Sequence, residues 1–451
     1  MKIKRLLIQK LFYPLGTMLA LAMLAGGPAA NAQGNAYEVI HDFTGANGGY
    51  PWYSLIFDAA GNLYGITAEG GTHPNCGQFG CGAIFKLSST SGGVWNSTVL
   101  YEFSGGTGGW TPAGGLVLDE AGNLYGTTLH GGGVEASGVV YKLSRTATGQ
   151  WTETVLHTFS GADDGGSPSG KLIFDSAGNL YGTTASGGAL GYGTVFELSP
   201  SSSGWTETQL YNFSGGSDGG SPQWGVTFDA AGNLYGSTSS GGYAGSSLCA
   251  SNQGCGVVFE LTPRESGRWS EKILNTFTGG NGRGSGPLVF DDSGNIYGTT
   301  GNGGEGCGTD GCGVVYELSP VAGGWNETVL FRFPGGGTGG WGGFGGSTPL
   351  GVILGSDGSL YGTAFYGGNY ESDCSLGFLG CGVVYRLSRS ATGRWGQTVL
   401  HSFTGGEDGG NPQSGLTLGP NGNLFGSGVS GPASSTCITL GGCGVVFEIA
   451  P

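Results

Sequence analysis

The chain has 451 residues, of which 102 are glycine and only 10% are charged. Its 31 acidic residues outnumber 16 Lys and Arg residues, so the formal net charge is −15. An acidic surface repels phosphate backbones, so composition argues against nucleic acid as a partner, although it would attract cations such as Ca²⁺. Glycine at this level is compatible with disorder, but here the glycines alternate with short apolar runs. That alternation is typical of many short strands joined by tight turns.

The first 32 residues have the features of a secretory signal peptide. A basic start that includes Lys2 and Arg5 precedes an apolar run over residues 11–25, and Ala30-Asn31-Ala32 is a small-x-small cleavage site. We therefore expect cleavage after Ala32 and a secreted protein, with the periplasm or the cell surface as other destinations. An uncleaved membrane anchor is the alternative. No second long apolar run follows, so the mature chain is not expected to span a membrane.

One sequence register then recurs seven times, and its marker is Asn-Leu-Tyr-Gly or a close variant. The copies are at residues 62–65, 123–126, 179–182, 233–236, 295–298, 359–362 and 423–426. The repeat units span about 37–103, 104–159, 160–213, 214–277, 278–333, 334–403 and 404–451. Together they are expected to form a single domain over residues 33–451.

Each unit contains four runs of strand length, which we call A to D in chain order. In the second unit they are residues 116–119, 123–126, 138–143 and 151–159. They are rich in Val, Tyr, Phe and Thr and four to nine residues long, which favours strands over helices. The A–B link, as in Asp175–Asn179, is a predicted tight hairpin. Run D carries polar residues at alternate positions and is the predicted outer edge.

Seven units of four antiparallel strands predict an all-β fold, a seven-bladed β-propeller. The last unit stops after run C, at Val445–Ile449, and the mature chain begins with an unpaired run D, at Tyr37–Phe43. We therefore expect residues 36–43 to complete the seventh blade and close the ring. An open β-solenoid is the alternative, but it gives no reason to divide one unit between the two ends.

Ten cysteines fall into five close pairs, each between runs B and C of one unit. The pairs are Cys76/Cys81, Cys249/Cys255, Cys307/Cys312, Cys374/Cys381 and Cys437/Cys443. An even count in an exported chain, at a shared loop position, predicts five local disulfides. Zinc binding is the alternative, but paired cysteines without nearby His make a poor zinc site.

The run Asn-Leu-Tyr-Gly-Thr-Thr-x-x-Gly-Gly followed by Gly-x-Val-Phe/Tyr-x-Leu resembles the GloVer (Gloeo_Verruco) tandem repeat of bacterial choice-of-anchor surface proteins. Copies occur at residues 123–132 with 138–143, and at 179–188 with 193–198. The resemblance covers nearly all of residues 37–450 and implies export and a repeat architecture. It implies no catalytic residues.

The B–C and D–A links of such a propeller share one face, which is the candidate ligand site. Acidic residues recur in the D–A links at Asp163, Asp164, Asp218 and Asp408. They are either oxygen ligands for Ca²⁺, the one candidate cofactor, or residues that close a repeated turn. Aromatic residues crowd the same links and would either stack on sugar faces or pack the glycine loops; they are Trp52, Trp110, Trp224, Trp341, Tyr366 and Tyr370.

No residue is predicted to be catalytic. Histidines 41, 157 and 401 occupy one repeat position, which favours a structural role. Paired carboxylates for glycoside cleavage would have to come from loop residues such as Glu305, Asp310, Glu371 and Asp373, whose separation the sequence does not give. We therefore expect a non-catalytic extracellular binding or scaffold protein whose partner is a polysaccharide or a surface protein. The alternative is a carbohydrate-active hydrolase or lyase on the same scaffold.

Overall fold

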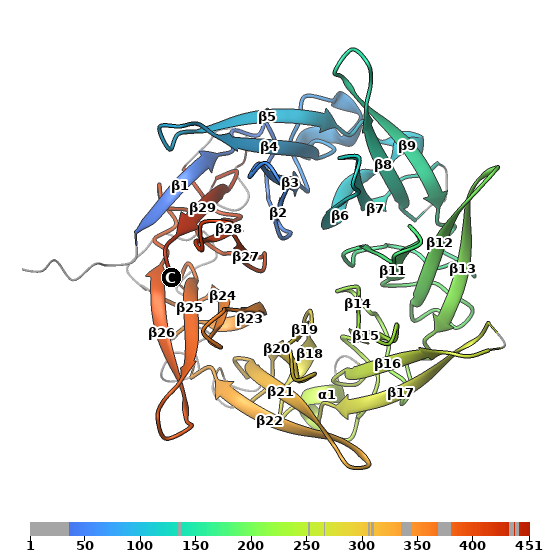
Figure 1. Cartoon of the computed structure of the whole chain (residues 1–451), viewed down its shortest axis with the longest axis vertical. Coiled ribbons are helices and arrows are strands. Elements are labelled where there is room, and N and C mark those ends of the chain that lie inside the picture. The colour runs from blue at the N-terminus through green and yellow to red at the C-terminus, as the bar shows by residue number, and fades with distance from the viewer. Residues whose placement is uncertain are drawn as a thin grey trace, which may run out of the picture. The chain divides into compact units, whose positions relative to one another are not determined.

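In the computed structural model, seven antiparallel sheets surround a central axis (Figure 1). The structure describes residues 36–133, 137–250, 253–265, 267–304, 307, 311–334, 345–368, 380–432, 437 and 442–451. The fold is an all-β, seven-bladed β-propeller with four antiparallel strand positions per blade, as predicted. The predicted signal peptide, residues 1–32, lies outside the described residues.

Each blade runs from strand A at the axis to strand D at the periphery (Figure 1). Blade 1 holds β2–β5, blade 2 β6–β9, blade 3 β10–β13, blade 4 β14–β17, blade 5 β18–β22, blade 6 β23–β26, and blade 7 β27–β29 with β1. The A strands are β2 (Ile56–Phe57), β6 (Trp110–Leu118), β10 (Ile173–Phe174), β14 (Val226–Phe228), β18 (Arg283–Ser285) with β19 (Val289–Phe290), β23 (Ser347–Leu354) and β27 (Thr417–Leu418). The B strands are β3 (Leu63–Thr67), β7 (Leu124–His130), β11 (Leu180–Thr184), β15 (Leu234–Ser237), β20 (Ile296–Asn302), β24 (Leu360–Tyr366) and β28 (Leu424–Gly428).

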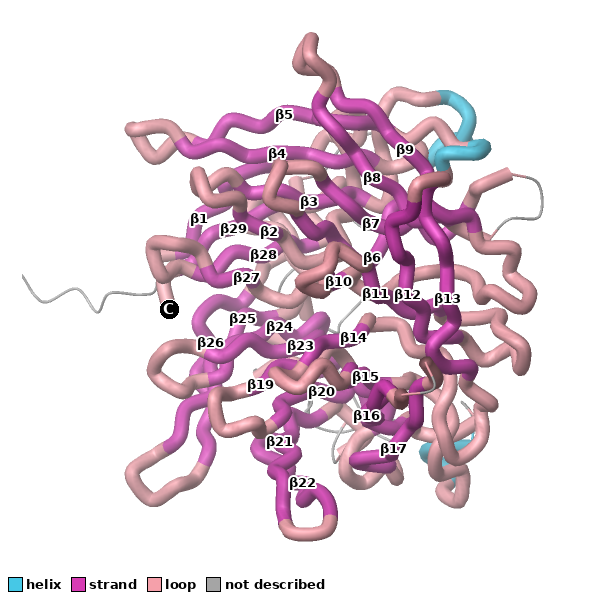
Figure 2. The backbone as a smooth tube through the Cα atoms, turned by 45° about the vertical axis from the view of Figure 1, so that its right-hand side comes forward, coloured by secondary structure: helices cyan, strands magenta, loops and turns pink. Residues whose placement is uncertain are grey.

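The C and D strands form the outer half of each blade. The C strands are β4 (Ala83–Ser89), β8 (Val139–Arg145), β12 (Thr194–Ser201), β16 (Val257–Pro263), β21 (Val314–Val321), β25 (Val383–Arg389) and β29 (Val445–Ile449). The D strands are β5 (Trp95–Glu102), β9 (Trp151–Thr158), β13 (Gly204–Asn212), β17 (Trp269–Thr276), β22 (Gly324–Arg332), β26 (Trp395–Ser402) and β1 (Tyr37–Asp42). Figure 2 shows the long C and D strands of neighbouring blades beside the connecting loops. In the loops that the structure describes there are three short helical segments: η1 (Pro74–Phe79), η2 (Gly106–Gly108) and α1 (Ser247–Ala250).

Strand A is shorter than predicted in five blades. It pairs with strand B over only two or three residues, as in β10. In four blades a single isolated bridge, such as Gly166↔Ser186, pairs the chain before strand A with the chain after strand B. The segment between contains proline, which has no N–H to donate to a ladder. In β6 and β23 a proline lies at the same loop position, and there the strand continues with an irregular register.

The marker Asn-Leu-Tyr-Gly places strand B against its neighbours. The Tyr181 hydroxyl donates a hydrogen bond to the Asp175 carboxylate of the A–B turn (3.2 Å), which also accepts hydrogen bonds from Asn179. Gly182 pairs with Phe196 of strand C, whose ring lies where a side chain would be. A Cβ at Gly182 would come within 2.6 Å of that ring, so this position has room only for glycine.

One aromatic pair holds every blade to the next. A buried Phe follows each D strand and packs edge-to-face on a strand-C ring of the following blade, with ring centroids 5.1 to 5.4 Å apart. The pairs are Phe43–Phe85, Phe103–Tyr141, Phe159–Phe196, Phe213–Phe259, Phe277–Tyr316, Phe333–Tyr385 and Phe403–Phe447. Strand C is buried on both faces as a result, as its consecutive apolar residues predicted.

The two ends of the repeat array share blade 7, which confirms the predicted closure. Strand β1 pairs antiparallel with β29, with Tyr37 opposite Ile449 and Asp42 opposite Val445. The Tyr37 ring stacks on His401 of blade 6, with ring centroids 3.7 Å apart. The closing blade therefore pairs strands C and D as the other blades do, and it contacts blade 6 through a ring stack.

Four of the five predicted disulfides lie within the described residues. They join Cys76 to Cys81, Cys249 to Cys255, Cys307 to Cys312, and Cys437 to Cys443. Cys381 is also disulfide-bonded, and its predicted partner Cys374 lies outside the described part of the chain. In that part, no helix is long and apolar enough to cross a membrane.

Candidate functional site

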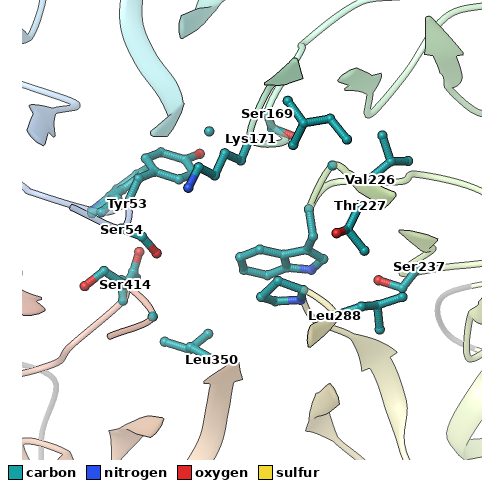
Figure 3. Close-up of a pocket in the computed structure, with 18 of the residues that line it drawn as sticks. Tyr53, Ser54, Ser169, Lys171, Val226, Thr227, Ser237, Leu288, Leu350 and Ser414 are labelled. Atoms are coloured by element: carbon teal, nitrogen blue, oxygen red, sulfur yellow. The ribbon is translucent and has the colours of Figure 1, made fainter. Parts of the chain in front are cut away.

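Two adjoining cavities lie on the axis of the propeller, and together we call them the axial channel. The inner cavity, drawn in Figure 3, has a volume of about 290 Å³ and is lined by residues from all seven blades. The outer cavity has a volume of about 520 Å³. The two cavities share Trp52, Tyr53, Ser169, Trp224, Leu350 and Gln413. The outer cavity also reaches Leu129 and Tyr366 at the ends of B strands, so it opens toward the face of the B–C and D–A loops, the loop face.

The D–A loop of each blade has the same backbone conformation where it approaches the channel. One residue adopts a left-handed conformation, with φ between 49 and 55° in the six blades where it is not glycine, as at Thr111 and Ser221. Its N–H donates a hydrogen bond to a carbonyl of the preceding blade, as from Ser221 to Tyr192 (2.8 Å). A non-glycine residue in this region costs on the order of 1 kcal/mol, and the hydrogen bond between blades offsets that strain.

The disulfides reinforce this connection between blades. In five blades the accepting carbonyl belongs to the second cysteine of a B–C loop pair, as in the bond from Thr111 to Cys81 (3.0 Å). In blades 2 and 3, which lack cysteines, Ser137 and Tyr192 supply the carbonyl. The loops that border the channel are therefore fixed to a rigid frame.

The residues that follow the left-handed position differ from one blade to the next. In six blades a proline comes next, and then the chain reaches the axis. The first residue after that proline is Trp52, Ala113, Ser169, Gln223, Leu350 or Gln413, and the second is Tyr53, Gly114, Gly170, Trp224, Gly351 or Ser414. Residues that recur in every blade build the blade. Residues that differ at the axis give the channel a chemistry without sevenfold symmetry.

Three of the predicted aromatic ligand residues meet in the channel. Trp52 and Trp224 line both cavities, and Tyr366 lines the outer one. Trp52 and Tyr366 pack on a buried cluster that includes Tyr50 and Phe365, so the protein core holds both rings in place. Each of the three side chains is half-buried, which leaves part of each ring open to the channel.

The other predicted aromatics lie elsewhere. Trp110 is 37% exposed and packs on His130, with ring centroids 4.5 Å apart, and it lines neither cavity. Trp341 and Tyr370 lie outside the described residues. Phe79, Leu190 and Tyr243 are further exposed apolar residues on B–C loops, and they line neither cavity.

Sequence reasoning missed two channel residues, Tyr53 and Lys171. Burial raises the pKa of the Tyr53 hydroxyl to about 12, with a backbone contact to Gly114 acting in the opposite direction. Lys171 is the only charged side chain among the described residues that line the two cavities. Both residues could have been found by aligning the seven D–A loops, because each lies within three residues of the loop proline and occurs in one blade only.

The predicted acidic residues do not line the channel. Asp164, Asp218 and Asp408 each accept hydrogen bonds from the backbone N–H and hydroxyl of a Ser or Thr four residues earlier. The Asp163 side chain is exposed, while its carbonyl accepts a hydrogen bond from Gln209. Within the described part of the chain, no three His, Cys, Asp or Glu residues form a group that could hold a metal ion. A role in binding Ca²⁺ stays a prediction.

The histidines on the D strands contact these same turns. His401 lies 3.1 Å from Asp408 and is hydrogen-bonded to it, whereas His157 lies 3.4 Å from Asp164, an ion-pair distance without a hydrogen bond. Tyr211 occupies the equivalent position in blade 3 and contacts Asp218 (3.3 Å). A pair that recurs between equivalent positions ties strand D to its loop. The candidate carboxylates Glu305, Asp310, Glu371 and Asp373 lie outside the described residues.

Solved structures with a similar fold have low sequence identity. One is a proposed 6-phosphogluconolactonase of Bacteroides uniformis, at 12% identity and a TM-score of 0.46, covering 76% of this chain and 83% of that one. Another is PorZ, a surface component of the type-IX secretion system of Porphyromonas gingivalis, at 13% identity and a TM-score of 0.47. That match covers 92% of this chain but only 48% of PorZ. A third is a gluconolactonase of Xanthomonas campestris, at 13% identity and a TM-score of 0.37, covering 92% of this chain and 90% of that one.

The sequence comparisons assign the family. No curated protein sequence matches the chain. The profile of the Gloeobacter/Verrucomicrobia repeat matches residues 29–148, 71–249 and 243–451, which together cover all seven blades. This confirms the resemblance drawn from the repeated motif, and the chain belongs to the Gloeobacter/Verrucomicrobia repeat family.

Proposed function

We propose that this protein is an exported, non-catalytic binding protein that holds a saccharide in the axial channel. The observation that carries the proposal is that the residues at the axis do not follow the repeat. The frame of each blade recurs around the ring, whereas Trp52, Trp224 and Tyr366 each occur at a channel position of one blade only. A purely structural ring would have no need for seven different sets of residues at its centre.

The chemistry of the lining supports a sugar ligand. Sugars present apolar faces edged by hydroxyl groups, and half-buried aromatic rings beside polar groups match both features. The channel combines the rings of Trp52 and Trp224 with the amides of Gln223 and Gln413 and the hydroxyl of Ser54. Its cavities of about 290 and 520 Å³ fall near the range of small-molecule sites.

We prefer binding over catalysis because the contacts between histidine and carboxylate recur at equivalent positions of the repeat. The His–Asp contacts of blades 2 and 6 occupy equivalent positions and tie strands to turns. Among the described lining residues, neither cavity contains Asp or Glu. The disulfides fit an oxidising compartment outside the cytoplasm, and export is part of the proposal.

The test is a glycan screen followed by calorimetric titration of the bound oligosaccharide. Trp224→Ala should weaken binding at least about tenfold, because removing a stacked ring loses about 1.5–3 kcal/mol of buried apolar contact. Trp110→Ala is the matched control, since this exposed Trp lies on the loop face but outside the channel. Equal affinity of Trp224→Ala and the unaltered protein would contradict the proposal. Shortened products after incubation would instead favour a hydrolase or lyase.

A further inference from the structure

We infer that the saccharide bound in the axial channel is acidic and that its carboxylate pairs with Lys171. This inference rests on the proposed function and adds the class of sugar. Lys171 comes from blade 3, where it follows Gly170 directly and precedes the short strand β10. Figure 3 shows its side chain extending into the inner cavity toward Tyr53, across from Ser54 and Ser414.

The structure of the blade does not require a lysine at this position. The equivalent residues are Ser54 in blade 1 and glycine in blades 2, 4 and 7, at Gly115, Gly225 and Gly415. The backbone of Lys171 pairs with Gly225 of blade 4, and any residue with a backbone N–H and carbonyl could make that contact. The charged side chain is therefore additional to what closes the ring.

Lys171 has no counter-ion in the described structure. Acidic residues outnumber Lys and Arg by 31 to 16 in the whole chain, yet no described carboxylate lies within ion-pair distance of this amine. The side chain is exposed to the channel, but the surrounding blades restrict its hydration. That desolvation lowers the pKa of the Lys171 amine. A bound anion would restore the lost stabilisation of the ammonium.

The other free polar groups of the inner cavity suit a carboxylate on a sugar ring. The Ser54 hydroxyl and the Gln413 amide line the cavity and have no hydrogen-bond partner within the described residues. A single ammonium matches the single charge of a uronate. A phosphate monoester would bring between one and two negative charges to this one ammonium, so it matches the site less well. The aromatic rings of Tyr53 and Trp224 would contact the sugar beside its charged group.

The experiment measures binding of three uronate trimers, of galacturonate, mannuronate and glucuronate, each beside its carboxyl-reduced neutral form. At least one acidic trimer should bind at least about tenfold more tightly than its reduced partner. Raising the NaCl concentration should weaken binding of the acidic form only. Lys171→Gln should lower the affinity for the acidic trimer to about that for its neutral form, and Lys171→Arg should retain the preference for the acidic trimer. Unfolding temperatures of both variants check that the ring is intact.

The outcomes separate the inference from the proposed function. Equal binding of acidic and neutral trimers, with Trp224→Ala still impaired, would overturn the role of Lys171 and leave the saccharide site standing. A preference for the acidic trimer that survives in Lys171→Gln would also overturn that role. Binding of free acetate or of a sulfated trimer as tightly as a uronate would overturn the class of ligand. Failure of every trimer to bind would overturn the inference, and the neutral glycan screen would decide the proposed function separately.

Discussion

The hydroxyl of Tyr211 donates a hydrogen bond to Glu271 (3.1 Å), and the two residues belong to D strands of neighbouring blades. Tyr101 makes the equivalent bond to Glu153 in blade 2 (2.9 Å). Burial raises the pKa of Glu153, Glu207 and Glu271 to about 7. The periphery of the ring therefore contains carboxyl groups that lose their proton near neutral pH.

Glu271 should make the protein less stable as pH rises. Its folded pKa is raised, so its contribution is complete below the unfolded pKa of about 4.5 and is lost as pH rises through about 7. Between about pH 4.5 and 7.5 the free energy of unfolding falls in the unaltered protein. In Glu271→Gln this fall should be smaller by on the order of 1–2 kcal/mol. Denaturant titrations at several pH values measure this, with the exposed Glu120→Gln as control. Parallel pH profiles for Glu271→Gln and the unaltered protein would contradict it.

Strand β1 should be required for a closed ring. A chain that begins at Thr44 loses the partner of β29 and the buried Phe43, so it should be destabilised by at least about 3 kcal/mol. It should also aggregate through the exposed edge of β29. A synthetic peptide of residues 36–43 should restore the unfolding temperature, whereas a scrambled peptide should not. If the shortened chain unfolds at the original temperature, closure by β1 does not stabilise the ring.

Thr348→Gly should stabilise the protein by about 0.5–1 kcal/mol. Thr348 is a β-branched residue at φ 55°, a conformation that glycine adopts without strain. Its hydroxyl is also buried without a hydrogen-bond partner, so the substitution removes a second cost. Thermal unfolding measures the change. Thr152→Gly, in the ordinary geometry of β9, should instead destabilise by about 1 kcal/mol. A loss of stability in both variants would show that the strain at Thr348 is small.

Gly170→Ala should destabilise the protein by about 1–3 kcal/mol through overpacking. A Cβ at Gly170 would lie 2.3 Å from the backbone nitrogen of Gly225 in the next blade, next to the bridge between Lys171 and Gly225. Gly396→Ala in β26 is the control, because nothing lies within 4 Å of a Cβ at that position. Equal unfolding temperatures for the two variants would show that the inner segments are less tightly packed than the structure indicates.

The sequence by itself determined the structural features that recur in the repeat units. The seven copies of Asn-Leu-Tyr-Gly, the run C residues and the paired cysteines predicted blades, strand order and local disulfides, because each depends on neighbours within one unit. The division of blade 7 between the two ends could also be predicted, since Tyr37–Phe43 has the pattern of a D strand without its own blade.

Only the tertiary structure decided which loop residues meet. Trp52, Lys171 and Trp224 are far apart in the chain and join one channel because closure of the ring brings three different blades to the same axis. Trp110 belongs to the same kind of loop but points to a different place, where it packs on His130. Composition and spacing describe one blade at a time, whereas the channel exists only where all seven converge.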